Sequence, residues 1–131
     1  MKKTPISEAE WPVMETLWKK GSATAGEIVR EVVLDRDVSM RTIKTHIRRL
    51  IAKGVIGYSI DPDNSRLYHY RPLVTRDEAV RSRNRSFLGF VYNRDPVALL
   101  DAFVEDNSLS DAEVEEIQRL LKRKRRESQE R

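Results

Sequence analysis

The sequence has no cysteine, few glycines and prolines, and no long hydrophobic run, and each shortage excludes a class of protein. Without cysteine, the 131 residues form no disulfide, thiolate nucleophile or cysteine-based zinc or copper site. Five Gly and five Pro do not indicate a disordered or fibrous chain. The apolar runs are only a few residues long, so we expect no membrane insertion. The first five residues lack the apolar stretch of a signal peptide, which predicts a cytoplasmic protein.

Patterns that carry catalysis or bind metals are also missing. We find no glycine-rich phosphate loop, no nucleophile elbow and no pair of carboxylates in an apolar setting, so the sequence predicts neither an enzyme nor a cofactor. The two histidines, His46 and His69, have no carboxylate or cysteine at ligand spacing, so we expect no metal site.

The positive charge of the chain is concentrated in one segment. The formal net charge is +4, and residues 38–54 contain five basic residues and no acidic one. Acidic and basic residues nearly balance in the rest of the chain. A cationic segment of this kind indicates an anionic partner, most simply nucleic acid.

Helix starts are marked by Ser or Thr followed three residues later by Glu. This pattern is a capping box, in which two side chains bind free N–H groups at the start of a helix. It begins at Ser7, Thr24, Thr75 and Ser110, while Ser39 and Asp95-Pro96 mark two further starts. We therefore predict helices at residues 8–19, 25–35, 40–53, 76–92, 96–106 and 111–125. Pro12 is expected to make the first start irregular or later.

Between residues 54 and 74 the pattern becomes that of a β-hairpin. Val55–Ile60 and Arg66–Arg71 are short β-prone runs, separated by turn residues at 61–65. Three helices followed by a hairpin predict a winged helix-turn-helix, so the expected fold class is mainly α with a small β-hairpin wing. We predict a winged-helix DNA-binding domain over residues 1–74 and a helical dimerisation domain with a basic C-terminal tail over residues 75–131.

The helix predicted at residues 40–53 has an apolar and a cationic face. At about 100° per residue, a core-facing stripe is formed by Met40, Ile43, Ile47, Leu50 and Ile51. The opposite face carries long cations and short side chains, which reach phosphates, guanine edges and thymine methyl groups. We predict base contacts from Arg41, Thr42, Thr45 and Arg49, and phosphate contacts from Lys44, Arg48, Lys53 and Arg66. His46 lies on the flank of this face and is included among the candidate DNA contacts, where it would alter base preference, although we favour a side chain that points to solvent.

Two features allow alternative interpretations. Tyr68 and Tyr70 share one strand face, opposite to Leu67 and His69, and we expect them to pack against the domain rather than stack on bases. The basic run Lys122–Arg126 is either a solvated helix end or a second phosphate contact, and we favour the solvated end.

The last three predicted helices carry apolar stripes that are too short to form a core of their own. We expect these stripes to meet those of a second copy in a homodimer, rather than pack back on the winged helix of a monomer. The predicted dimerisation residues are Val80, Phe87, Leu88, Val91, Leu100, Phe103, Val104, Ile117, Leu120 and Leu121.

The order and spacing of several short pieces of the sequence carry a family resemblance. These include Ser7–Trp11, Leu17-Trp18, Thr42–Thr45, Arg49-Leu50, Arg66–Val74, Phe87-Leu88 and Phe103–Glu105. From about Ile6 to Leu121 the chain therefore resembles the penicillinase-repressor family, the BlaI/MecI group with the copper-responsive CopY repressors as relatives.

The resemblance implies a homodimeric repressor whose winged helix reads a palindromic operator in double-stranded DNA. It also implies a membrane-bound sensor metalloprotease as a partner, which relieves repression by a cut in the dimerisation region. The family pattern has an Asn-Phe pair at that cut, and the aligned residues here are Ala102 and Phe103. Two other functions stay open: a winged-helix protein-interaction module and a ligand-responsive regulator.

Overall fold

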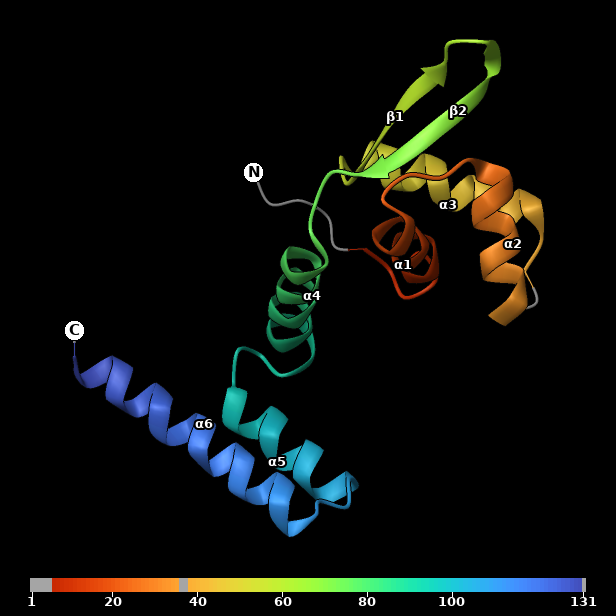
Figure 1. Cartoon of the computed structure of the whole chain (residues 1–131). Helices are drawn as coiled ribbons and strands as arrows, with labels where there is room; N and C mark the ends of the chain where they lie inside the picture. Colours follow the sequence, from red (N-terminus) through yellow and green to blue (C-terminus); the bar gives the residue numbers. More distant parts are fainter. Residues whose placement is uncertain (1–5, 36–37, 131) are drawn as a thin grey trace. The chain divides into compact units, whose positions relative to one another are not determined.

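The computed structural model describes residues 6–35 and 38–130. Residues 1–5, on which the expectation of no signal peptide rests, lie outside the described residues. Along the described chain, three helices are followed by a hairpin and then by three more helices (Figure 1). The elements are α1 (Trp11–Lys20), α2 (Ala25–Asp35), α3 (Met40–Ala52), β1 (Ile56–Asp61), β2 (Asn64–Pro72), α4 (Arg76–Val91), α5 (Pro96–Asp106) and α6 (Asp111–Gln129). The predicted mainly helical fold with a hairpin is confirmed.

The predicted helix caps form. At the start of α6 the Ser110 hydroxyl accepts the N–H of Glu113 at 3.1 Å, and the Glu113 carboxylate accepts the N–H of Ser110 at 3.0 Å. The same pair of bonds forms in the boxes that begin at Ser7, Thr24 and Thr75. Ser39 and Asp95 cap α3 and α5. Because each cap satisfies N–H groups that have no partner within the helix, the local sequence fixes where these helices begin.

The later start of the first helix expected from Pro12 is confirmed, and one other helix end differs from the prediction. α1 begins at Trp11 rather than at residue 8, although the box at Ser7 forms. Pro12 has no N–H to donate, so the regular hydrogen-bond ladder begins only beyond it. α6 continues to Gln129 instead of ending at residue 125. The added residues are mainly Arg, Glu and Gln, which have good helix propensity.

One hydrophobic core holds the first three helices and the base of the hairpin together. Its largest fully buried apolar side chains are Met14, Leu17, Ile28, Ile43, Leu50, Ile56 and Val13. Ile43, Ile47 and Leu50 of the predicted stripe are buried, and Ile51 is half-buried. The prediction for Met40 is wrong, because this side chain is 51% exposed. Met40 is the first residue of α3, and the buried stripe begins one turn later.

The hairpin is tied to the helices through its second strand. β1 and β2 are antiparallel, with Tyr58 opposite Tyr70 and Ile60 opposite Tyr68. Tyr70 also exchanges two backbone hydrogen bonds with Ala23, at 2.8 and 2.9 Å, which anchors β2 beside the start of α2. β1 is shifted by one residue from the predicted Val55–Ile60, and β2 is longer than the predicted Arg66–Arg71. Asp61 and Asn64 turn the chain with side-chain bonds to the N–H groups of Asp63 and Arg66, each at 3.0 Å.

The chain forms two compact units, Met1–Phe87 and Leu88–Arg131. The division falls inside α4, whereas the predicted domain boundary follows residue 74. Thr75 and Arg76 stay with the first unit because Ala79 is buried in its core and Arg76 forms an ion pair with Glu15 at 3.0 Å. The assignment of the two parts to DNA binding and dimerisation stays a prediction.

The second unit contains no buried side chain among its described residues. Its most exposed large apolar side chains are Phe90, Val91, Val97, Phe103, Val104 and Leu121. None of the helices in residues 6–35 and 38–130 is long and apolar enough to cross a membrane.

Candidate nucleic-acid interface

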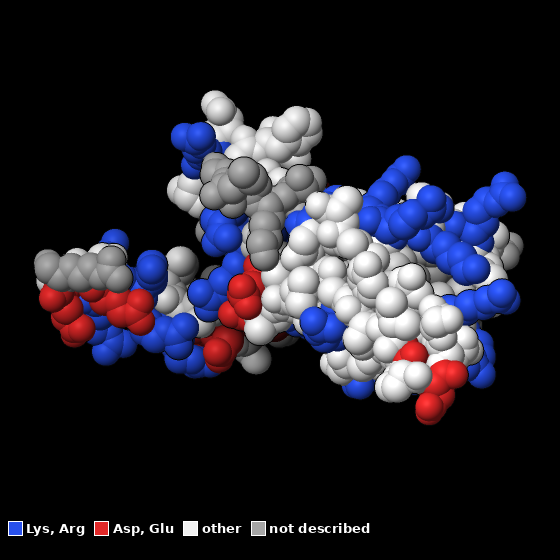
Figure 2. Space-filling model, turned by 90° about the horizontal axis from the view of Figure 1, so that it is seen from above, with Lys and Arg blue, Asp and Glu red and all other residues white. Residues whose placement is uncertain are grey.

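The outer face of α3 carries exposed cations that no described carboxylate neutralises. Arg41, Lys44, Arg48 and Arg49 are exposed and form no ion pair within the described part of the chain. The roll of the helix about its axis is fixed by Ile43 and Leu50, which are buried on the opposite side. Figure 2 shows Lys and Arg side chains gathered on one face of the first unit. This face therefore has the charge that an anionic polymer requires.

Short hydroxyl side chains lie between these cations. The Thr45 hydroxyl donates to the backbone carbonyl of Arg41 at 3.0 Å, and the Thr42 hydroxyl lies 3.0 Å from that of Ser39 at the helix start. Both threonines are half-buried and hold fixed positions on the helix surface. A threonine side chain is short and offers a methyl group and an acceptor oxygen, so it permits close approach of the helix to the base edges in a DNA groove.

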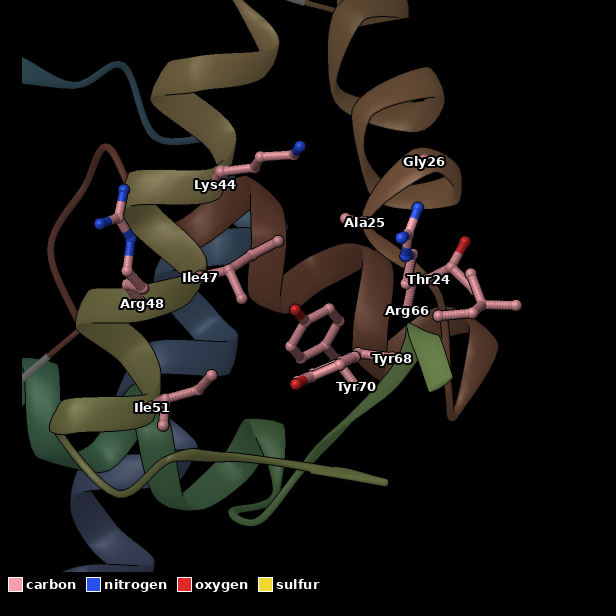
Figure 3. A pocket seen from close by; sticks show the side chains of 11 residues that line it. Thr24, Ala25, Gly26, Lys44, Ile47, Arg48, Ile51, Arg66, Tyr68 and Tyr70 are labelled. Atoms are coloured by element: carbon pink, nitrogen blue, oxygen red, sulfur yellow. The ribbon is translucent and has the colours of Figure 1, made fainter. Parts of the chain in front are cut away.

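A groove lies between α3, the start of α2 and the wing (Figure 3). Lys44 extends from α3 toward the first turn of α2, and Arg66 reaches the same turn from β2 (Figure 3). The apolar part of the lining comes from Ile47 and Ile51. The other lining residues are Thr24, Ala25, Gly26, Arg48, Leu67, Tyr68 and Tyr70. The structure thus brings together three of the four predicted phosphate-binding cations.

The wing carries a cluster of three tyrosines, of which the sequence analysis named two. Tyr58 stacks on Tyr68 with ring centroids 5.1 Å apart and 18° between the ring planes, and Tyr70 lies beside both. Tyr70 packs against the core as expected, and burial together with the two neighbouring rings raises the pKa of its hydroxyl. Tyr68 is instead 36% exposed, and Tyr58 is 46% exposed. The alternation of Ile56, Tyr58 and Ile60 could have identified the third ring.

The wing tip is stabilised by a side-chain hydrogen bond. The His69 Nε2 lies 2.9 Å from the Asp61 carboxylate. This bond, together with the N–H of Asp63, holds the pKa of the Asp61 carboxyl below its ordinary value. Arg66 is the cation that the wing contributes to the lining of the groove.

The expected solvent exposure of His46 is wrong. Its side chain is buried at 9% exposure, and its Nδ1 has no hydrogen-bond partner. The register of α3 explains the difference, because His46 immediately precedes Ile47 and follows Ile43 by three residues, both on the buried side. His46 is thus a core residue and is withdrawn from the set of DNA contacts.

Lys53 also takes a different place from the one predicted. Its ammonium group pairs with the carboxylate of Glu10, a residue with 2% exposure that also accepts the N–H of Ser7. Burial raises the pKa of Glu10, but the bonds from Lys53 and Ser7 outweigh burial, so the pKa lies below its ordinary value. Lys53 is the C-cap residue of α3, so this ion pair ties the end of that helix to the start of α1. Sequence reasoning missed Glu10 because it had already assigned this residue to the capping box.

The predicted dimerisation residues lie on α4, α5 and α6. Val80, Leu88 and Ile117 are half-buried, whereas the others are exposed. The prediction omitted Phe90, which is 90% exposed in the last turn of α4. No group of three or more His, Asp or Glu side chains in the described residues could hold a metal ion.

The comparison with protein families decides what this chain is. The model of the penicillinase repressor family matches residues 6–123. The chain belongs to the penicillinase repressor family. Its relatives include the methicillin resistance regulatory protein MecI of Mammaliicoccus sciuri, which is 36% identical over 119 residues, or 91% of this chain and 94% of the relative. The penicillinase repressor of Bacillus licheniformis is 32% identical over 122 residues, or 92% and 93% of the two chains.

Two solved structures of BlaI repressors are similar to part of this chain. The solution structure of the DNA-binding domain of the repressor BlaI has 34% identity and a TM-score of 0.51, covering 60% of this chain and 93% of that domain. The monomeric form of Bacillus licheniformis BlaI, solved in complex with the blaP half-operator, has 31% identity and a TM-score of 0.50, covering 59% and 90%. The winged-helix fold predicted from the sequence is confirmed.

Proposed function

We propose that this penicillinase repressor family member is a cytoplasmic, homodimeric transcriptional repressor that binds a palindromic operator in double-stranded DNA. The observation that carries the proposal is the outer face of α3, where Arg41, Lys44, Arg48 and Arg49 are exposed without a described carboxylate partner. A helix with such a face, placed just before a hairpin, fits the major groove while the wing follows the backbone. The similarity to a BlaI structure solved with a half-operator supports the same interpretation.

The side chains on α3 divide into two roles. Arg41, Thr42, Thr45 and Arg49 lie on the outward face and are assigned to base edges. An Arg side chain can bind a guanine edge with two hydrogen bonds, and a threonine methyl group can contact that of thymine. These contacts depend on the base sequence, and losing a good one costs roughly 1–3 kcal/mol of discrimination.

Phosphate contacts come from the groove between α3 and the wing. Lys44 and Arg66 reach the first turn of α2, where the positive end of the helix dipole adds to their charge (Figure 3). Arg48 lines the same groove. These cations fix the position of the protein on the duplex and contribute little to sequence preference.

Dimerisation is assigned to the helices beyond the wing. Their described residues include Phe90, Val97 and Phe103 with at least half of each side chain exposed, and apolar area of this kind gains free energy when a second copy covers it. A twofold dimer places its two α3 helices in successive major grooves, ~34 Å apart or a multiple of that. The palindromic operator follows from this symmetry.

Relief of repression by proteolysis in α5 is part of the proposal. Ala102 and Phe103 lie within this helix of 11 residues, and Phe103 belongs to the exposed apolar set. A cut between them by a membrane-bound sensor metalloprotease would separate α6 from the rest of the dimer. Because dimer formation depends on concentration, a loss of a few kcal/mol there would lower operator occupancy.

The proposal is tested by selecting the binding site from a library of random duplexes and titrating variants against the selected site and a scrambled duplex. Arg49→Ala and Thr45→Ala are expected to reduce discrimination between the two duplexes by roughly 1–3 kcal/mol. Arg48→Gln is the control for a phosphate contact. It should weaken both duplexes about equally and lower the slope of log K against log salt by about 0.9.

Each other outcome identifies a different function. If the library yields no preferred site and the wild type shows no salt dependence, the winged helix is a protein-interaction module. If a small molecule releases the intact chain from its site, the protein is a ligand-responsive regulator. If Arg49→Ala and Thr45→Ala both leave discrimination between the two duplexes unchanged, the assigned orientation of α3 is wrong.

A further inference from the structure

A second cationic segment lies in the last helix, apart from α3. Residues 119–126 of α6 contain Arg119, Lys122, Arg123, Lys124, Arg125 and Arg126 and no acidic residue. All six side chains are exposed. α6 is one continuous helix through this segment and up to Gln129, at the C-terminal end of the chain in Figure 1. The segment is therefore helical along its length, and its exposed cations agree with the solvated helix end predicted from the sequence.

The cations of this segment are not explained by the packing of α6. The apolar residues of the helix are Val114, Ile117, Leu120 and Leu121, and none follows Leu121. At about 100° per residue, the face opposite to this apolar stripe is formed by Arg119, Lys122, Arg123 and Arg126. When a second copy covers the apolar stripe, this opposite face and the last two turns of α6 therefore remain in water.

Helix stabilisation does not account for the segment either. The helix dipole acts within about one turn of the helix end, and Arg126 is the only cation in the last turn of α6. Arg119 pairs with Glu116 at 2.7 Å, and Arg123 lies 4.0 Å from Glu127. The remaining cations, Lys122, Lys124, Arg125 and Arg126, form no ion pair with a carboxylate in the described part of the chain.

We infer that residues 119–126 of α6 form a second binding site for duplex DNA, which contacts phosphates outside the site that α3 reads. The inference rests on the proposed function. Six cations along about two helical turns match a backbone that carries one negative charge per ~1.7 Å of duplex. Because α3 and the wing occupy the phosphates of the operator itself, free phosphates are those on either side. When both sites of one chain bind the same duplex, the second contact forms at a high effective concentration, so the overall affinity exceeds that of either site alone.

Duplex DNA fits this segment better than a membrane surface does. A helix that lies in a bilayer surface buries its apolar face, commonly with Trp or Phe. α6 contains no aromatic residue, and Arg119, Lys122, Arg123 and Arg126 lie on the face opposite to its short apolar stripe. Binding to anionic vesicles is therefore measured as well, so that the experiment distinguishes a membrane partner from duplex DNA.

The experiment compares two matched double variants of the full chain. K122Q/K124Q removes two cations of the segment while keeping good helix formers, and K19Q/K20Q removes two lysines whose partner is Glu31 in the first unit. Each is titrated against the selected site alone and against the same site extended by one helical turn of flanking duplex (~10 base pairs) on each side. Salt is varied between about 50 and 200 mM.

On the extended duplex, K122Q/K124Q is expected to lower the slope of log K against log salt by about 2 for each protomer, or about 4 for the dimer, which makes the loss of affinity over this salt range about a hundredfold smaller. Discrimination between selected and scrambled flanked sites, and binding to the short duplex, should not change, and K19Q/K20Q should match the wild type. Equal slopes for the two variants would overturn the inference. So would a loss of binding to phosphatidylserine vesicles in K122Q/K124Q without a change in slope. If the proposed function itself is wrong, the wild type will show no discrimination between selected and scrambled duplexes, so the two failures give different results.

Discussion

Replacing Lys53 by Met tests whether this cation serves the fold rather than the phosphate backbone. The variant keeps an unbranched side chain of similar length but leaves the Glu10 carboxylate without its cation, at 2% exposure. Removing one partner of a buried ion pair costs about 3–5 kcal/mol. The Lys53 side chain is 19% exposed, so water reaches its charge and we expect the lower end, about 3 kcal/mol.

Tryptophan fluorescence during urea unfolding measures this loss selectively. Both tryptophans of the chain, Trp11 and Trp18, lie in α1 with ring centroids 5.3 Å apart, so their signal reports on the first unit. With a urea m-value of about 1–3 kcal/mol per M, a loss of about 3 kcal/mol lowers the midpoint by about 1–3 M. The matched control is Lys44→Met on the same helix, where an exposed cation without a described carboxylate partner should change stability by less than about 0.5 kcal/mol.

The pH dependence of the stability difference between wild type and Lys53→Met gives an independent check. The pKa of Glu10 is lowered in the folded protein, so its ion pair contributes stability above the ordinary value of 4.5 and loses it as the pH falls through the folded pKa. The midpoints of wild type and Lys53→Met should therefore converge below pH 4.5. In DNA titrations Lys53→Met should keep the wild-type salt slope, unlike Arg48→Gln. Equal midpoints for the two Met variants at neutral pH, or a reduced salt slope for Lys53→Met, would refute this reasoning.

Four further predictions concern the core, the dimer and its cleavage. His46→Leu removes the buried Nδ1 that lacks a partner and should raise the free energy of unfolding by about 1 kcal/mol without changing operator discrimination, as urea unfolding and duplex titration would measure. Removing residues 88–131, which leaves the first unit whole, should turn a dimer into a monomer with much weaker operator binding, and sedimentation of a full-length monomer that still binds tightly would contradict this. Phe103→Ala should weaken dimerisation by about 1–3 kcal/mol, measured by sedimentation at several concentrations. Coexpression with the cognate sensor and inducer should yield fragments cut beside Phe103, and cleavage within residues 40–53 would be evidence against the proposed route.

Much of the architecture followed from local sequence because its signals act over a few residues. A capping box needs two side chains three positions apart, and both bonds form at Ser110 as at the other predicted boxes. The apolar spacing of Ile43, Ile47 and Leu50 fixed which side of α3 turns inward, and therefore which side carries its cations outward. The alternation along β2 likewise placed Tyr68 and Tyr70 on one face.

Tertiary structure alone decided the positions that depend on partners far apart in the chain. Glu10 and Lys53 are separated by 43 positions, and only the packing of α1 against the end of α3 turns a presumed phosphate contact into an ion pair. Tyr58 joins Tyr68 through the strand register, and Lys44 and Arg66 line one groove because of the placement of the wing. A local pattern determines which face of an element is buried, but the identity of the neighbour depends on the free energy of the whole packed core.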